Sequence, residues 1–129
     1  MSTSKEIINT AKAPPPIGPY NQAVKAGHTL YISGQIALSP ETGDLIVGSV
    51  ADEARQVLDN LAVILAEAGY APTDVVKTTI FLRDMGDFAA VNEVYGTYFT
   101  EQAPARETVA VAGLPKNVNV EISAIAWKA

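Results

Sequence analysis

Apolar residues at helical spacing predict two amphipathic helices. From residue 50 to residue 68, apolar side chains return every three or four positions and form a single stripe. Ser49 is placed to cap the first turn of this helix, and Gly69 followed by Pro72 is placed to end it. A second apolar stripe runs from residue 88 to about residue 99, and we expect Asp87 to cap it. Each helix has one apolar face, so each needs a second layer to cover that face.

Strand patterns surround these helices. Residues 5–9 suit a short edge strand, and the segments 21–26 and 29–35 predict two strands joined by a turn at Gly27 and His28. The segment 75–84 alternates in the manner of a strand, and two further β-patterned segments flank a turn at 113–117. Residues 13–20, APPPIGPY, contain four prolines. These prolines exclude a helix and predict a stiff extended segment along the surface or a cleft.

The order of these elements predicts a fold class. Strands, a helix, a strand, a helix and two strands suit a two-layer α+β domain over residues 1–129, with both helices on one face of a mixed sheet. The other sheet face then lacks a cover of its own, although the segment 118–127 carries apolar residues on both faces. Because an open apolar face is commonly buried against another subunit, we expect an oligomer.

Two charged residues stand out in the last two strand segments. If these segments pair as a hairpin closed by Gly113 and Val118, then Arg106, Thr108 and Glu121 share one face. Arg106 and Glu121 would then stand about 13 Å apart along the strands. That separation is too long for a direct ion pair and suits the two ends of a small-ligand cleft. Both residues also have ordinary structural explanations, as an exposed edge charge and as a solvent-facing or lysine-paired acid.

Composition narrows the range of functions. The net charge is −5 and the nine lysines and arginines are scattered, which disfavours nucleic-acid binding. The chain has no cysteine and a single histidine, His28, so neither a thiol nucleophile nor a metal site is expected. No apolar run approaches the ~20 residues of a membrane span. The N-terminal residues also lack the apolar core of a secretory signal, and we expect a cytoplasmic protein.

Several strings along the chain match a known family. They are IGPY at 17–20, YISGQI at 31–36, ARQVLDNL at 54–61, VVKTTIFLRDMGDFAAVNEVY at 75–95, PAR at 104–106, LPK at 114–116 and VEISAIA at 120–126. With these strings the chain strongly resembles the reactive intermediate deaminase family, also called RidA or YjgF-like. The resemblance spans nearly the whole chain, and its most specific part runs from residue 104 to residue 122.

The resemblance implies a chorismate-mutase-like α+β fold, assembled as a homotrimer with clefts between subunits. RidA-type members are hydrolases that act on C=N bonds. They convert reactive 2-enamino and 2-imino acids, such as 2-aminoacrylate and 2-aminocrotonate, to 2-keto acids and ammonia, and no cofactor is implied. The family's carboxylate-binding arginine maps onto Arg106, and its water-positioning glutamate maps onto Glu121. The expected substrate-binding positions beside them are Tyr20, Ser33, Gly34, Asn92 and Thr108.

This chain departs from the family pattern directly after the arginine. Many members carry a small residue and then a cysteine, where this chain has Glu107 and Thr108. By strand alternation, Glu107 points away from the face of Arg106. Thr108 keeps a hydroxyl beside Arg106 but excludes any role for a thiol.

Two other functions stay open at this point. One is a trimer of the same family that binds carboxylates or a protein partner without turnover, and the presence of both Arg106 and Glu121 argues against it. The other is an RNA-cleaving translation inhibitor, an activity attributed to some relatives. The acidic composition and the lone His28 weigh against RNA cleavage.

Overall fold

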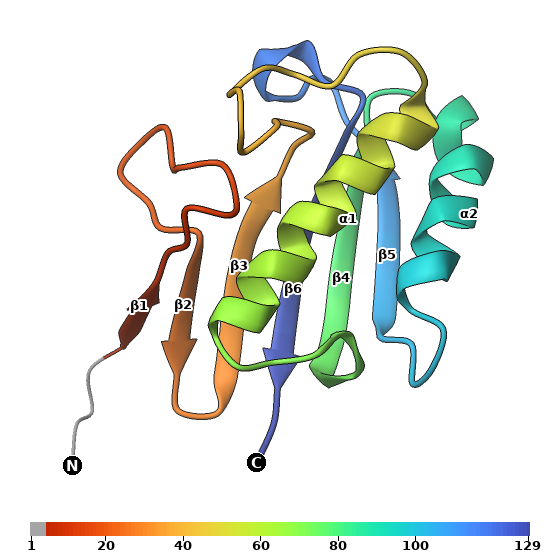
Figure 1. The fold of residues 1–129 in the computed structure, drawn as a ribbon. Coiled ribbons are helices and arrows are strands. Elements are labelled where there is room, and N and C mark those ends of the chain that lie inside the picture. The colour runs from red at the N-terminus through yellow and green to blue at the C-terminus, as the bar shows by residue number, and fades with distance from the viewer. Residues whose placement is uncertain (1–4) are drawn as a thin grey trace.

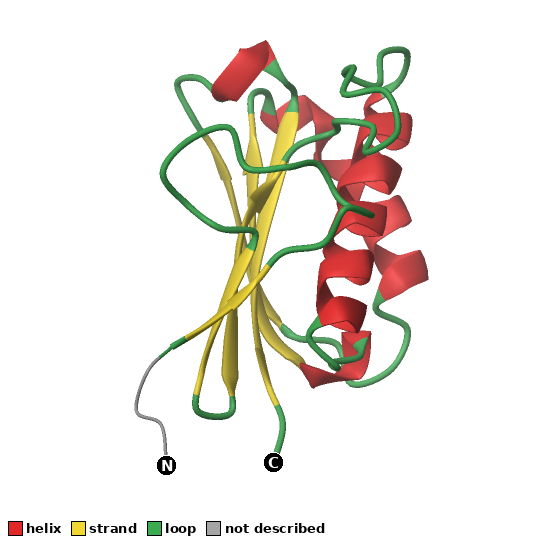
Figure 2. Cartoon of the chain, turned by 60° about the vertical axis from the view of Figure 1, so that its left-hand side comes forward, coloured by secondary structure: helices red, strands yellow, loops and turns green. Residues whose placement is uncertain are grey.

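The computed structural model describes residues 5–129, which form two layers. One layer is a six-stranded β-sheet, and the other consists of two α-helices. Figure 2 shows both helices on the same side of the sheet. The predicted two-layer α+β arrangement is therefore confirmed. Within residues 5–129, no helix has the length and apolar character that a membrane crossing requires.

The predicted helices and strands are present, with small shifts at their ends. The strands are β1 (Glu6–Ile8), β2 (Ala23–Ala26), β3 (Thr29–Gln35), β4 (Val75–Leu82), β5 (Ala105–Ala110) and β6 (Val120–Trp127). The helices are α1 (Val50–Glu67) and α2 (Phe88–Tyr98), and three short 3₁₀ turns are η1 (Pro72–Asp74), η2 (Met85–Asp87) and η3 (Pro115–Asn117). The proline-rich segment 13–20 connects β1 to β2 without helix or strand, as its composition predicts.

The sheet order is β1-β2-β3-β6-β4-β5 (Figure 1), and it overturns the predicted C-terminal hairpin. β4 lies between β5 and β6, so these two strands are not neighbours. The chain leaves β4, forms α2 and returns as β5 parallel to β4. It then crosses the end of β4 through η3 and runs back as β6, antiparallel to both β4 and β3. The turn residues at 113–117 mark a reversal of the chain, but they do not determine which strands pair.

α1 covers the middle of the sheet. Its side chains Leu58, Leu61 and Ile64 are almost fully buried, as are Ile80 of β4 and Ile122 of β6. Burial of each such side chain stabilises the fold by about 1.5–3 kcal/mol. The contacts of α1 with β6 and β3 hold these strands in place at the centre of the sheet, and β6 carries Glu121.

The ends of the two helices are formed in different ways. The Ser49 hydroxyl accepts the Asp52 N–H at 3.1 Å, and Gly69 follows α1 with a φ of +82°, so both predicted signals for α1 are confirmed. Asp87 stands at the N-cap position of α2, as predicted, but its side chain makes no capping hydrogen bond. Asp84 instead accepts the Gly86 N–H at 2.8 Å and caps η2, which runs directly into α2.

The face of the sheet opposite the helices carries exposed apolar side chains. Ile7, Tyr31, Val109 and Trp127 are 44%, 51%, 42% and 50% exposed. Strand pairing places Ile7, Val24 and Tyr31 in one row across this face. The described chain therefore leaves uncovered the face that the sequence pattern predicts to be uncovered.

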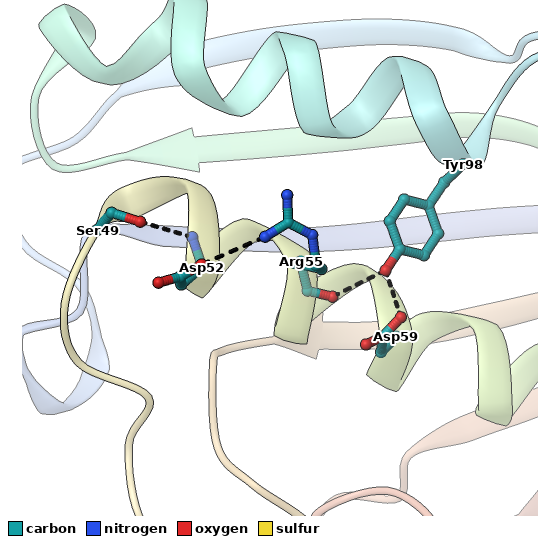
Figure 3. A network of polar contacts seen from close by, with 5 residues as sticks. All are labelled: Ser49, Asp52, Arg55, Asp59 and Tyr98. Atoms are coloured by element: carbon teal, nitrogen blue, oxygen red, sulfur yellow. Dashed lines mark hydrogen bonds and ion pairs between the residues drawn. The ribbon is translucent and has the colours of Figure 1, made fainter.

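A polar latch joins the two helices near the C-terminal end of α2 (Figure 3). Tyr98 reaches from α2 across α1, where its hydroxyl donates to the Asp59 carboxylate and lies 3.2 Å from the Arg55 carbonyl oxygen. Burial, reinforced by the adjacent carboxylate, raises the pKa of Tyr98. Arg55 also pairs with Asp52 at 3.3 Å, which links the latch to the capped first turn of α1.

We expect Tyr98→Phe to lower the free energy of unfolding by about 1 kcal/mol, because one hydrogen bond to a partly exposed carboxylate is lost. Urea denaturation of wild type, Tyr98→Phe, Asp59→Ala and the double variant measures the coupling between the two side chains. If the losses of unfolding free energy in the two single variants add up to the loss in the double variant, the two side chains are not coupled and the proposed contact is contradicted.

Candidate functional site

Four of the predicted site residues line one cleft. Tyr20, Ser33, Gly34 and Glu121 border a cavity of about 430 Å³. Residues 14–17 of the proline-rich segment form one wall, and the remaining lining residues are Gln22, Gln35, Ile36, Leu38 and Pro115. The cleft thus combines an apolar wall with a small group of polar atoms, which is the usual composition of a small-molecule site.

Gly34 and Glu121 meet because β3 and β6 are neighbours. The regular pairing of these strands is interrupted between Ile32 and Gln35, which is the stretch that contains Ser33 and Gly34. Such an irregularity redirects side chains at the edge of a site. A Cβ at position 34 would lie 2.8 Å from Cδ of Glu121. The absence of a side chain at Gly34 therefore gives the Glu121 carboxylate its place.

The hydroxyl groups of the cleft are oriented by backbone contacts. Ser33 Oγ donates to the Asn21 carbonyl at 2.6 Å, so its lone pairs are left to accept from a ligand or water. Tyr20 is 47% exposed, and its hydroxyl oxygen accepts the Ile17 N–H at 3.4 Å. The Tyr20 hydroxyl hydrogen is then available to donate into the cleft.

Glu121 is a half-buried carboxylate without a cationic partner in the described chain. Neither of the two ion pairs among residues 5–129 includes it. Burial raises the pKa of Glu121 above the usual value for a glutamate. A carboxyl group in this state accepts a proton more readily at neutral pH than an exposed glutamate does.

The other predicted residues form a second group at the edge of the sheet. Arg106 of β5 donates from Nη1 to Asn92 Oδ1 on α2 at 2.6 Å. Its guanidinium carbon lies 5.0 Å from the ring centre of Tyr95 and 5.5 Å from that of Phe88. Tyr95 is itself held by a 2.7 Å hydrogen bond with Thr78. The guanidinium is therefore oriented before any ligand binds.

Sequence reasoning missed Phe88 and Tyr95 as parts of the arginine site, because both fit the apolar stripe of α2. A signal was nevertheless present in their spacing. Phe88, Asn92 and Tyr95 stand at positions i, i+4 and i+7 and therefore share one helix face. Asn92 is itself exposed, but it lies on the side of α2 that meets β5, next to this apolar stripe.

Thr108 lies on the same side of β5 as Arg106. Strand pairing matches Arg106 with Thr78 and Thr108 with Ile80, and both partners face the helix layer. The Thr108 hydroxyl is the one buried side-chain polar atom of residues 5–129 that has no hydrogen-bond partner. A ligand group or a water bound beside Arg106 would satisfy it.

The two groups of residues lie on opposite faces of the sheet. Glu121 pairs with Phe81 of β4, whereas Arg106 pairs with Thr78, which points to the other side. The prediction that Arg106, Thr108 and Glu121 share one face is therefore wrong, since it assumed the hairpin that β4 interrupts. Arg106 does not line the Glu121 cleft. One chain therefore holds two separate groups of predicted site residues, one on each face of the sheet, and we call these groups the half-sites.

Glu107 points away from Arg106, as strand alternation predicts. Its carboxylate lies 3.4 Å from Lys77 Nζ and accepts a 3.2 Å hydrogen bond from the Thr79 hydroxyl. Both partners belong to the face opposite the helices. Glu107 therefore changes that face and leaves the surroundings of Arg106 unchanged.

His28 takes no part in either half-site. It lies in the turn between β2 and β3, at the opposite end of β3 from Ser33 and Gly34, and its ring packs edge-on against Trp127 at 6.0 Å. Among the described residues, no three histidine, aspartate or glutamate side chains are grouped to hold a metal ion.

Known proteins resemble this chain over nearly its full length. The family model described as Endoribonuclease L-PSP matches residues 10–128. The human 2-iminobutanoate/2-iminopropanoate deaminase is 51% identical over 125 residues, which cover 97% of this chain and 91% of that protein. The solved structure of RidA from the Antarctic bacterium Psychrobacter sp. superposes with a TM-score of 0.92 at 46% identity and covers 95% of this chain and 99% of that one.

A solved Escherichia coli protein, TdcF with bound serine, has the same architecture. It superposes with a TM-score of 0.91 at 46% identity, over 96% of this chain and 99% of TdcF. Its two-layer arrangement and that of RidA agree with the helices and mixed sheet described above. The chain therefore belongs to the Endoribonuclease L-PSP family, the reactive intermediate deaminase family that its motifs resemble.

Proposed function

We propose that this protein hydrolyses reactive 2-imino acids and their enamine tautomers to 2-keto acids and ammonia. The observation that carries the proposal is the state of Arg106. Its guanidinium is oriented by Asn92 and two aromatic rings, and it belongs to neither ion pair of the described chain. A preoriented arginine without an acidic partner is suited to a carboxylate ligand, and relatives named for imino-acid deamination support that choice of ligand.

Arg106 selects the substrate by its carboxylate. The planar guanidinium can donate two parallel N–H bonds to the two carboxylate oxygens. The unpartnered Thr108 hydroxyl, two residues further along β5, supplies a third donor on the same side. Neutral imines lack the group that these donors recognise, so they bind poorly.

Glu121 activates the water that attacks the imine. Water adds to the C2 carbon of the C=N bond as Glu121 accepts one of its protons, and the nitrogen takes a proton from solvent water to become an amine. Glu121 then returns its proton to this nitrogen, which leaves as ammonia when the C–N bond breaks. The C2 hydroxyl releases its proton to solvent water as its oxygen becomes the keto group. The raised pKa of Glu121 suits both proton transfers. No electrons are exchanged, so the reaction calls for no redox cofactor.

The remaining residues of the cleft place the water and the nitrogen. The Ser33 hydroxyl accepts a hydrogen bond from the water or the substrate nitrogen, since its own proton is directed to Asn21. The Tyr20 hydroxyl donates a hydrogen bond to one of the same groups. Gly34 leaves room for the carboxylate of Glu121 and for close approach of the substrate. These groups act on the reacting atoms and require no contact with the substrate carboxylate.

A complete site requires a second subunit. We propose a homotrimer in which Arg106 of one subunit faces Glu121 of its neighbour across each cleft. Two features support this assembly, namely the separation of the half-sites on opposite faces and the exposed apolar row on the uncovered face. Burial of that row contributes about 25 cal/mol for each Å² of apolar surface removed from water.

Wild-type protein is expected to accelerate keto-acid formation from an imine generated by a dehydratase, whereas Arg106→Ala lowers kcat/KM by about 10- to 100-fold through loss of charge-assisted hydrogen bonds. Arg55→Ala, which removes an arginine from the exposed side of α1, is the matched control and keeps wild-type activity. Equal keto-acid formation with and without wild-type protein contradicts the proposal. Arg106-dependent binding of 2-ketobutyrate without turnover would instead identify a carboxylate-binding module.

Subunit mixing tests how the cleft is shared. Arg106→Ala and Glu121→Gln proteins are each expected to keep at most about a tenth of wild-type activity alone. When the two proteins are co-refolded in equal amounts, half of the subunits carry an intact Arg106 and the other half carry an intact Glu121. If a cleft takes Arg106 from one subunit and Glu121 from its neighbour, about a quarter of the clefts contain both residues, and about a quarter of wild-type activity returns. If both residues acted from one chain, no cleft of the mixture would contain both, and activity would stay at the level of the single variants.

Glu121→Gln is expected to lower activity by about 10²–10⁴-fold and to remove the acidic limb of the kcat/KM profile. Because burial raises the pKa of Glu121, the folded protein keeps a proton that the unfolded chain releases, and stability falls as the pH rises through that window. Glutamine removes this effect. The variant should therefore unfold at a higher temperature than wild type near neutral pH, and the difference should vanish below about pH 4. A thermal shift that does not vary with pH would exclude this origin.

A further inference from the structure

The proline-rich wall of the cleft has few backbone donors with which to hold itself in place. We call residues 13–20 the strap. Four of its residues are prolines, which have carbonyl oxygens but no N–H group. The strap forms no part of a strand, yet Ala13 and Pro14 are buried. Buried carbonyl oxygens require donors, so the donors must come from outside the strap.

Gln22 supplies those donors. Its side chain is 98% buried, since only 2% of the residue is exposed. Nε2 lies within hydrogen-bond distance of the carbonyl oxygens of Pro14 at 2.8 Å, Thr10 at 3.0 Å and Ala13 at 3.3 Å, so one of its two hydrogens is shared between two of them. Oε1 accepts the Thr10 N–H at 2.6 Å. Both ends of one amide are therefore used to hold the start of the strap and the residues that lead into it.

The backbone of Gln22 is tied to the polar side of the same cleft. Its carbonyl oxygen accepts the Ser33 N–H at 2.9 Å, and its own N–H donates to Asn9 Oδ1 at 3.0 Å. Ser33 precedes Gly34, against which Glu121 rests. Gln22 thus connects the apolar wall to the residues that would hold the reacting atoms, and its side chain determines where that wall stands.

Other amino acids cannot reproduce this arrangement. A glutamate would direct carboxylate oxygens at three carbonyl oxygens, which repel it. A methionine has nearly the same length but neither donates nor accepts at these positions. Only a primary amide of this length provides two hydrogens and one acceptor together.

We propose that Gln22 is a positioning residue that sets the width of the cleft for the substrate's side chain. This inference rests on the proposed hydrolysis of 2-imino acids. The exposed part of the strap, residues 15–17, faces the cleft with proline and isoleucine side chains. An apolar substrate side chain packs against this wall, whereas the imine carbon lies at the polar side. Loss of the amide therefore weakens binding of the side chain more than it slows the chemical step.

The test compares Gln22→Met and Gln22→Glu with wild type by hydrogen exchange of residues 9–20. In Gln22→Met this segment is expected to exchange about 10-fold faster at every pH, while β4 and β6 keep wild-type exchange. In Gln22→Glu the segment should loosen at high pH and tighten as the pH falls, because a protonated carboxyl regains one donor. Wild-type exchange of the segment in Gln22→Met, or equal loosening of β4 and β6, would overturn the proposal.

The kinetic part of the test uses two imines, derived from 2-aminobutyrate and from leucine. Gln22→Met is expected to raise KM about 10-fold for the leucine-derived imine and less for the smaller one, with kcat changed by less than about threefold. For Gln22→Glu, the ratio of its KM to the wild-type KM, measured at the same pH, is expected to fall toward 1 as the pH decreases. Gln56→Glu makes the same change on α1, where the amide donates to Asn60 at 2.9 Å, and its relative KM stays near 1.

The two proposals fail in different ways. If wild-type protein hydrolyses no imine, the proposed reaction fails, and calorimetric Kd values for 2-ketobutyrate and 4-methyl-2-oxopentanoate replace KM. A selective loss of affinity for the longer acid in Gln22→Met then still supports the role of Gln22. If wild-type turnover is normal and Gln22→Met lowers kcat with KM unchanged for both imines, the reaction stands and the role of Gln22 is refuted.

Discussion

The parallel pairing of β5 with β4 determines where the predicted site residues lie. Because the chain passes through α2 before it forms β5, this strand joins the sheet at its edge and runs beside β4 in the same direction. The strand that follows must then cross the end of β4 to reach β3. This path puts Arg106 under α2 and Glu121 on the opposite face. A simple hairpin of the same two segments would have put them on one face.

Separation leaves both charges without compensation inside one chain. Glu121 is half buried with a raised pKa, and Arg106 faces two aromatic rings and an amide oxygen instead of a carboxylate. A half-buried charge such as that of Glu121 lowers stability unless something else satisfies it, whereas the exposed Arg106 carries no such cost. The Thr108 hydroxyl, buried and unpartnered beside Arg106, shares this property with Glu121. Groups of this kind gather where a ligand or another subunit is meant to complete the arrangement.

Local structure was predictable from the sequence, because its causes are local. Each correctly predicted feature depends on residues that are close together in the sequence. These features are the apolar stripe of α1, the Ser49 cap, the glycine after the helix and the proline-rich segment 13–20. Strand pairing was not predictable in the same way. The turn residues at 113–117 are compatible with a hairpin and with a crossing over β4. The choice depends on α2, which the Tyr95–Thr78 and Asn92–Arg106 hydrogen bonds join to β4 and β5. The site residues were identified by motif, whereas their division between two faces followed from the pairing alone.

The contact between Gly34 and Glu121 restricts both positions at once. No unusual backbone angle requires glycine at position 34, and the restriction is entirely one of space. The two residues compete for a single volume, and the atoms of Glu121 that occupy it are the end of a flexible side chain. A deaminase of this fold that acquired an alanine at position 34 would therefore have to turn the carboxylate of Glu121 to another place. Such a protein could keep its fold, but its acid would no longer lie where the cleft now holds it.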